Sequence, residues 1–162
     1  MTVDDALFRR ALGRFASGIC VVTARDGDGT PVGVTISSFA SLSLRPPLVL
    51  YCLGKLSSHF EAFMDDTHFG VSVLAEDQGA VADIFAGQGA DKFDRVVTRA
   101  GDNGCRLVDG SVLQIECDVV DCHDGGDHVI IVGQVQEVSF GTATRPLGWY
   151  ASRYVHLADI AL

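Results

Sequence analysis

The segment LQIECDVVDCHDGGDHVIIVGQV, residues 113–135, predicts an antiparallel β-hairpin. Apolar residues occupy the odd positions from Leu113 to Val119, and polar residues occupy the even positions from Gln114 to Asp118. This alternation is typical of a strand with one buried face. The turn Asp124–Asp127 then leads into a second apolar run, His128–Val135. This is the strongest hairpin signal in the chain, and it favours an antiparallel sheet.

Four further segments outside this hairpin are predicted as strands. Ile19–Ala24 and Pro31–Ser38 flank the turn Asp26–Gly29, so we expect them to form a second hairpin. Leu48–Leu53 is apolar at every position, which is typical of a strand covered on both faces by the core or by a second subunit. In Phe69–Val73 the apolar residues alternate, which indicates another strand.

Three short helices are expected beside these strands. The first begins near a hydroxyl cap at Thr2 and ends by Gly18, and the second is capped by Ser57 or Ser58. The third covers Gln78–Phe85, after which Ala86–Cys105 lacks periodicity and is expected to be a surface loop. About six strands and three helices without regular βαβ units predict one mainly β domain over residues 1–162, an antiparallel barrel with helical appendages.

Composition excludes several functional classes. The 162 residues carry 21 acidic against 12 basic side chains, a net charge of −9, and the basic residues are scattered, which argues against nucleic acid. No apolar run is long enough for a membrane span, and the acidic N-terminus is unlike a signal peptide, so a cytoplasmic location is expected. Five cysteines without a Cys-x-x-Cys pair predict no disulfide framework, and the histidine spacing indicates no metal site.

Hydroxyl side chains are threaded through the otherwise apolar stretch Gly33–Val49. A buried hydroxyl without a partner costs about 1–3 kcal/mol, so either the fold satisfies this row or a ligand does. One interpretation is a set of turn and capping hydroxyls, and the other is a set of donors to a flat, polar-edged ligand. A serine nucleophile is disfavoured, because the G-x-S-x-G motif is missing.

Two further signals each have a structural and a functional interpretation. His128 begins a strand after a turn, and it is either a structural residue or part of a site. Lys92–Arg95 is either a solvated charge run or part of a lid that supplies cations to an anionic ligand. Neither signal is decisive by itself.

Taken together and in order, the motifs of this chain resemble those of the flavin reductase family. The segments that carry the resemblance are Phe8–Thr23, Gly33–Phe39 with Ser41, Pro46 and Pro47, Ser57-Ser58, Phe85-Ala86, Lys92-Phe93, Glu116-Cys117, Gly126–His128 with Gly133, and Trp149–Tyr154. The resemblance covers nearly the whole chain. It implies a split β-barrel that binds FMN, assembled as a homodimer. One departure is Ser152, which stands where many relatives carry glycine in the pattern Tyr-x-Gly-Arg-Tyr.

The resemblance also implies a set of site residues. Those matching Thr35–Ser38 line the isoalloxazine ring and ribityl chain, and His128 lies near the face where nicotinamide binds. The Ser57-Ser58 segment approaches the phosphate, with Lys55, Lys92 and Arg95 as helpers. The expected cofactor-binding residues are Thr35, Ile36, Ser37, Ser38, Ser41, Cys52, Leu53, Ser57, Ser58, Lys92, Phe93, Arg153 and Tyr154, with His128 as the catalytic residue.

The implied activity is hydride transfer from NADH or NADPH to FMN or FAD, with the reduced flavin passing to a separate monooxygenase component. The flavin itself carries the difficult chemistry, while the protein holds the two rings about 3–3.5 Å apart. Two alternatives stay open at this point. One is a split-barrel flavoprotein with tightly bound FMN that transfers electrons or reduces a bound substrate such as a corrinoid. The other is a non-enzymatic flavin- or haem-binding barrel.

Overall fold

The structure, a computed structural model, describes residues 3–158. Its helices are α1 (Asp5–Leu12), α2 (Phe60–Asp65), α3 (Gly79–Ala86) and α4 (Lys92–Arg95). Its strands are β1 (Ser17–Gly18), β2 (Cys20–Arg25), β3 (Pro31–Ile36), β4 (Ala40–Leu44), β5 (Pro47–Gly54), β6 (His68–Val73), β7 (Thr98–Ala100), β8 (Arg106–Val108), β9 (Leu113–Gly125), β10 (His128–Phe140), β11 (Leu147–Tyr150) and β12 (Arg153–His156).

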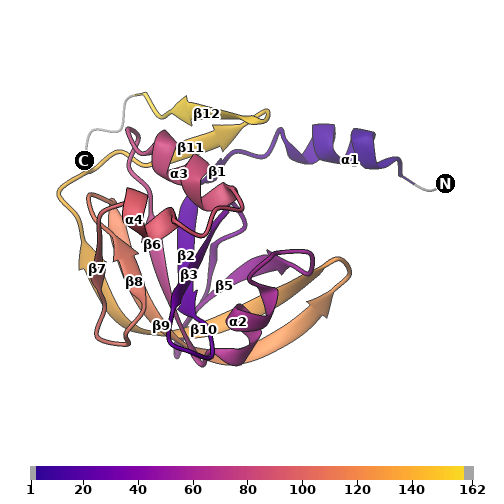
Figure 1. Ribbon diagram of the computed structural model, residues 1–162. Coiled ribbons are helices and arrows are strands. Elements are labelled where there is room, and N and C mark those ends of the chain that lie inside the picture. The colour runs from indigo at the N-terminus through magenta and orange to yellow at the C-terminus, as the bar shows by residue number, and fades with distance from the viewer. Residues whose placement is uncertain (1–2, 159–162) are drawn as a thin grey trace.

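A seven-stranded antiparallel sheet in the order β3-β2-β6-β9-β10-β5-β4 forms the body of the molecule (Figure 1). Its centre is the long hairpin of β9 and β10, in which His128 pairs with Gly125 and Phe140 pairs with Leu113. The second hairpin joins β2 to β3, with Cys20 opposite Ile36. Both hairpins predicted from the sequence are therefore confirmed, as is the mainly β, antiparallel fold.

The two end strands of this sheet, β3 and β4, are consecutive in the chain and are separated only by residues 37–39. The sheet therefore curls until its ends meet, and the apolar faces enclose one core. Tyr51, Phe69 and Ile131 are fully buried there, and Tyr51 packs edge-on against Phe69 with ring centroids 5.1 Å apart. The barrel remains split beside β3, where the interstrand hydrogen-bond ladder stops.

A second core lies between the barrel and helix α3. It contains Ile19, Leu74, Phe85 and Leu147, all nearly or fully buried. The small sheet β1-β11-β12 covers this core, and the Tyr154 hydroxyl of β12 donates a 2.6 Å hydrogen bond to Asp83 of α3. The C-terminal strands thus hold α3 against the barrel.

Several details differ from the sequence-based expectation. The Asp4 carboxylate caps α1 by accepting from the Ala6 amide at 3.0 Å, because the helix begins at Asp5, later than predicted from Thr2, which lies outside the described residues. Helix α2 begins at Phe60 after His59, so the prediction that Ser57 or Ser58 caps it is wrong.

The expected loop 86–105 contains α4 and β7, both too short to show periodicity. Sequence analysis also missed β1, β4, β8, β11 and β12.

Strand β5 differs from its expected form in burial. Val49, Tyr51 and Leu53 are buried, whereas Leu48, Leu50 and Cys52 between them are only half-buried. One face of the strand therefore packs in the core, and the other remains partly accessible. Among residues 3–158, no helix is long and apolar enough to cross a bilayer.

The turn between β11 and β12 has an unusual backbone. Tyr150 pairs with Arg153, so Ala151 and Ser152 form a two-residue loop, and their φ angles are 49° and 61°. Such left-handed values match the primed turns that join twisted strands, and they favour glycine because a Cβ is strained there. This geometry explains why the family pattern has glycine at the position that Ser152 occupies here.

We expect Ser152→Gly to raise the free energy of unfolding by about 1 kcal/mol, because glycine adopts this φ without a Cβ penalty. For a chain of this length, that gain corresponds to a rise in Tm of about 2–4 °C. Thermal unfolding followed by circular dichroism measures it. The control is Ser139→Gly within β10, which should lower Tm because a strand glycine costs backbone entropy. An unchanged or lower Tm for Ser152→Gly would contradict the strain argument.

Candidate functional site

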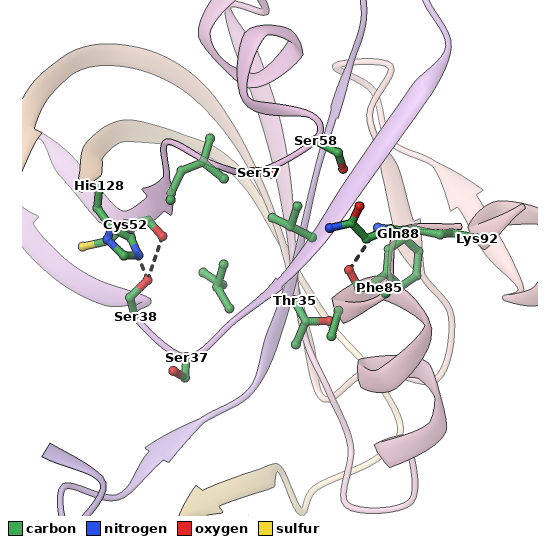
Figure 2. A pocket seen from close by; sticks show the side chains of 16 residues that line it. Thr35, Ser37, Ser38, Cys52, Ser57, Ser58, Phe85, Gln88, Lys92 and His128 are labelled. Carbon is green, nitrogen blue, oxygen red and sulfur yellow. Dashed lines mark hydrogen bonds between the residues drawn. The ribbon is translucent and has the colours of Figure 1, made fainter. Parts of the chain in front are cut away.

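A cavity of about 400 Å³ opens at the split of the barrel, between the end of β3 and the end of β5 (Figure 2). Helix α3 and the segment after it form a further wall, and the turn before α2 forms another. The residues that line the cavity are Val34, Thr35, Ile36, Ser37, Ser38, Cys52, Leu53, Gly54, Ser57, Ser58, Phe85, Ala86, Gly87, Gln88, Lys92 and His128.

Two of the hydroxyl groups in this lining are used by the fold itself. The Thr35 hydroxyl donates to the Ala82 carbonyl of α3 at 2.6 Å. The Ser38 hydroxyl accepts from the Cys52 amide at 2.9 Å and donates to the Cys52 carbonyl at 3.2 Å, so it bridges the split to β5 (Figure 2). These two side chains therefore shape the cavity, and each has already used its one O–H donor, so it can only accept from a ligand.

Other hydroxyl groups remain available to a ligand. Ser37 and Ser58 make no side-chain hydrogen bond within residues 3–158, and Figure 2 places them on different sides of the cavity. Ser57 accepts only a long bond of 3.4 Å from the His59 amide. The row of hydroxyls noted in the sequence is thus divided between structural and ligand-facing members.

A buried ammonium group forms part of the cavity wall. Lys92 is only 4% exposed, and its Nζ donates to the carbonyls of Gly33 and Phe85, each at 3.1 Å. Burial lowers the pKa of Lys92. Within the described residues no carboxylate pairs with this ammonium, so the wall carries a positive charge that favours an anionic ligand.

Gly33, whose carbonyl binds Lys92, leaves room for two aromatic rings. A Cβ on Gly33 would lie 2.6 Å from the Phe85 ring and 3.3 Å from the Phe93 ring, which is closer than side chains pack. The two rings meet edge to face with centroids 5.2 Å apart. Phe93 therefore supports the wall from behind and does not line the cavity.

His128 is the first residue of β10 and stands opposite Gly54 of β5, at the mouth of the cavity. Its Nδ1 lies 2.7 Å from a carboxylate oxygen of Asp127, and this hydrogen bond lowers the pKa of Asp127. Because an ionised carboxylate only accepts, Nδ1 carries the proton in this bond. About half of the His128 side chain is exposed, so Nε2 is accessible to a ligand.

Four predicted cofactor residues lie outside this cavity. Ser41 is exposed on β4, and Phe93 lies behind Phe85 as described. Arg153 is exposed on β12, while Tyr154 packs against Gly79 and Trp149 and binds Asp83. Two of the expected helpers are engaged elsewhere, since Lys55 forms an ion pair with Asp124, and Arg95 lies 4.0 Å from Asp91.

The structure also adds residues to the site that the sequence-based set did not contain. The added residues are Val34, Gly54, Phe85, Ala86, Gly87 and Gln88. Val34 and the pair Phe85-Ala86 belonged to the family-like motifs, whereas Gly54, Gly87 and Gln88 did not. Gly54 ends β5, and Gly87 and Gln88 follow α3, which packs against β3.

Comparison with known proteins identifies the family. A family model described as "Flavin reductase like domain" matches residues 12–158. The reductase component of 4-nitrophenol 4-monooxygenase/4-nitrocatechol 2-monooxygenase from Rhodococcus opacus is 43% identical, over 95% of this chain and 82% of that protein. A flavin reductase from Pseudomonas putida is 36% identical, over 98% of this chain and 93% of that protein.

A solved structure agrees with these relatives. The NADH:FAD oxidoreductase SgcE6 of Streptomyces globisporus C-1027, in complex with NAD and FAD fragments, superposes with a TM-score of 0.92 at 35% identity. The match covers 100% of this chain and 99% of that one. With the split barrel and its cavity, these similarities lead to one conclusion: the chain belongs to the flavin reductase family.

Proposed function

We propose that this chain is an NAD(P)H-dependent flavin reductase that supplies reduced FMN or FAD to a separate monooxygenase component. The observation that carries the proposal is the cavity at the split of the barrel. Among residues 3–158, it combines hydroxyls that lack a hydrogen-bond partner with a buried ammonium that no carboxylate pairs with, and an accessible histidine stands at its mouth. A cytoplasmic location is part of the proposal, since the five cysteines are free thiols, as is usual in a reducing compartment.

The cavity residues fit a flavin. Ser37 and Ser58 offer hydroxyl groups to the polar edge and chain of the cofactor, while Val34, Ile36 and Leu53 offer apolar contact to its ring. When bound, the flavin supplies the hydride-accepting chemistry. The Lys92 ammonium stabilises negative charge in the cavity, either the phosphate or the charge that develops on reduction.

His128 and Asp127 orient the second substrate in this proposal. The carboxylate holds the imidazole in one tautomer at the cavity mouth, so Nε2 faces the space where a nicotinamide ring must approach. The contribution of this pair is orientation, because a reactive distance between two rings depends on how each is held.

NADH oxidation under air, followed by absorbance, tests the activity with protein alone, with added FMN and with added FAD. We expect a colourless protein whose turnover requires added flavin, because the cavity is open at its mouth. Turnover by a yellow protein without added flavin would favour the tightly bound FMN alternative. No oxidation of NADH or NADPH would leave only a flavin-binding barrel.

In the same assay, His128→Ala should raise the KM for NADH by about two- to tenfold, the range of one lost hydrogen bond. The flavin Kd should stay unchanged. His123→Ala is the matched control, since His123 lies on β9 outside the cavity and pairs with Asp121. An unchanged KM in His128→Ala would remove this residue from the nicotinamide site.

Replacement by alanine is expected to change flavin binding at Ser37 and stability at Ser38. Ser37→Ala should weaken flavin binding by about two- to tenfold and leave Tm unchanged, because its hydroxyl has no partner among the described residues. Ser38→Ala should lower the stability by about 1–3 kcal/mol, because the Cys52 amide loses its acceptor. Flavin titration by fluorescence quenching and thermal unfolding of each variant measure the two effects. If both variants changed flavin affinity and stability to the same extent, the division into a ligand-facing Ser37 and a structural Ser38 would be wrong.

We also propose that the protein is a homodimer. Helix α1 projects away from the barrel (Figure 1) and contains no buried residue. Leu7, Phe8 and Leu12 on the helix are exposed, as is Phe15 just after it. A stripe of large apolar side chains on a projecting helix is typical of a subunit contact.

The double variant Leu12→Glu/Phe15→Glu should shift the protein from dimer to monomer, as measured by light scattering after gel filtration. Thr30→Glu, in the exposed turn between β2 and β3, is the control and should remain dimeric. A wild-type protein that is already monomeric would refute the assembly without affecting the proposed activity.

A further inference from the structure

Three arginines gather at one place on this acidic protein. Arg9, Arg10 and Arg14 line a cleft of about 360 Å³ between α1 and the turn of Ala151 and Ser152. The chain holds 12 basic residues in all, so a quarter of them fall within six positions. Within residues 3–158, none of the three forms an ion pair with a carboxylate. Their charges are therefore free to meet an external anion.

Backbone contacts fix the walls of this cleft relative to each other. The Ala151 amide donates a 2.7 Å hydrogen bond to the Gly13 carbonyl, and Ser17 and Gly18 pair with Trp149 and Gly148. The end of α1 is thus joined to the β11–β12 hairpin. The three exposed arginines therefore surround a concave surface whose backbone walls are fixed relative to each other.

A short stretch of chain connects the cleft to the wall of the cavity at the split of the barrel. Cys20, six residues after Arg14, pairs with Ile36 in the cavity wall, and six residues span at most about 20 Å. On the other side, the pKa of Asp127 is lowered chiefly by its hydrogen bond to His128 and to a smaller extent by Arg9. Arg9 therefore acts on the carboxylate that is hydrogen-bonded to His128.

Phosphate is the anion that this arrangement suits. Guanidinium groups bind phosphate oxygens through paired N–H donors, and several of them around one cleft match a pyrophosphate. Both dinucleotides relevant to a flavin reductase carry a pyrophosphate that extends away from the reacting ring.

We propose that the cleft formed by Arg9, Arg10 and Arg14 binds the phosphate groups of a dinucleotide whose ring occupies the cavity mouth. The proposal rests on the proposed function. The group that the cleft binds is a pyrophosphate, which belongs to either NAD(P)H or FAD. The cleft then binds the phosphate groups of the dinucleotide, which extend beyond the cavity.

The decisive variant is Arg10→Gln/Arg14→Gln, with FMN as the flavin because FMN has no pyrophosphate. We expect the KM for NADH to rise about tenfold while kcat and the FMN Kd stay unchanged. The wild-type KM should rise with salt more steeply than that of the variant, since exposed charges are screened. The matched control Arg45→Gln/Arg145→Gln removes two exposed charges elsewhere and should leave KM unchanged. Arg10→Lys/Arg14→Lys should restore part of the affinity.

Further arms of the experiment identify the source of the pyrophosphate. If the variant weakens FAD binding but leaves the KM for NADH with FMN unchanged, the cleft binds the pyrophosphate of FAD. The affinity for ADP, measured by calorimetry, reports on the cleft without enzymatic turnover. It therefore tests this proposal even if the protein proves to have no reductase activity. ADP should bind wild type and not the variant. Equal ADP binding, or unchanged KM for NADH together with unchanged Kd for FAD, would overturn the proposal.

Discussion

The hydrogen bonds between Ser38 and Cys52 are the constraint on which the site depends. A seven-stranded sheet with consecutive end strands must bring those ends together, yet β3 and β5 are not joined by a regular ladder. The Ser38 hydroxyl replaces the missing ladder by binding both backbone groups of Cys52. The barrel is therefore held closed at one point and stays open beside it, and the opening is the cavity.

The positive wall of that cavity depends on a second local arrangement. Lys92 lies in the segment after α3, where short-range sequence patterns are weakest, but its ammonium reaches two backbone carbonyls of different elements. One of these carbonyls belongs to Gly33, whose missing side chain leaves room for the rings of Phe85 and Phe93. A single buried cation thus joins β3 to the end of α3 and sets the sign of the charge offered to a ligand.

The sequence predicted most of the site through the motif around Thr35–Ser38, together with Ser57, Ser58, Lys92 and His128, all of which line the cavity. It could not distinguish hydroxyls that hold the fold from those that face a ligand. Thr35 and Ser37 are alike as sequence signals, and only the position of Ala82 shows that Thr35 is engaged. The sequence also could not show that the Tyr154 hydroxyl reaches Asp83 on α3, outside the cavity, so its assignment to the cofactor stays a prediction.

The sequence by itself determined the two hairpins, the mainly β fold and the family, because alternation of apolar residues, turn glycines and motif order are local properties of the chain. The tertiary structure decided which strand ends meet, where the barrel stays split, and which charged groups lack a partner. Arg14 and the β11–β12 turn of Ala151 and Ser152 line one cleft, although more than a hundred positions separate them in the chain. Interactions of that range depend on how the sheet curls, and no local pattern encodes the curvature that brings them together.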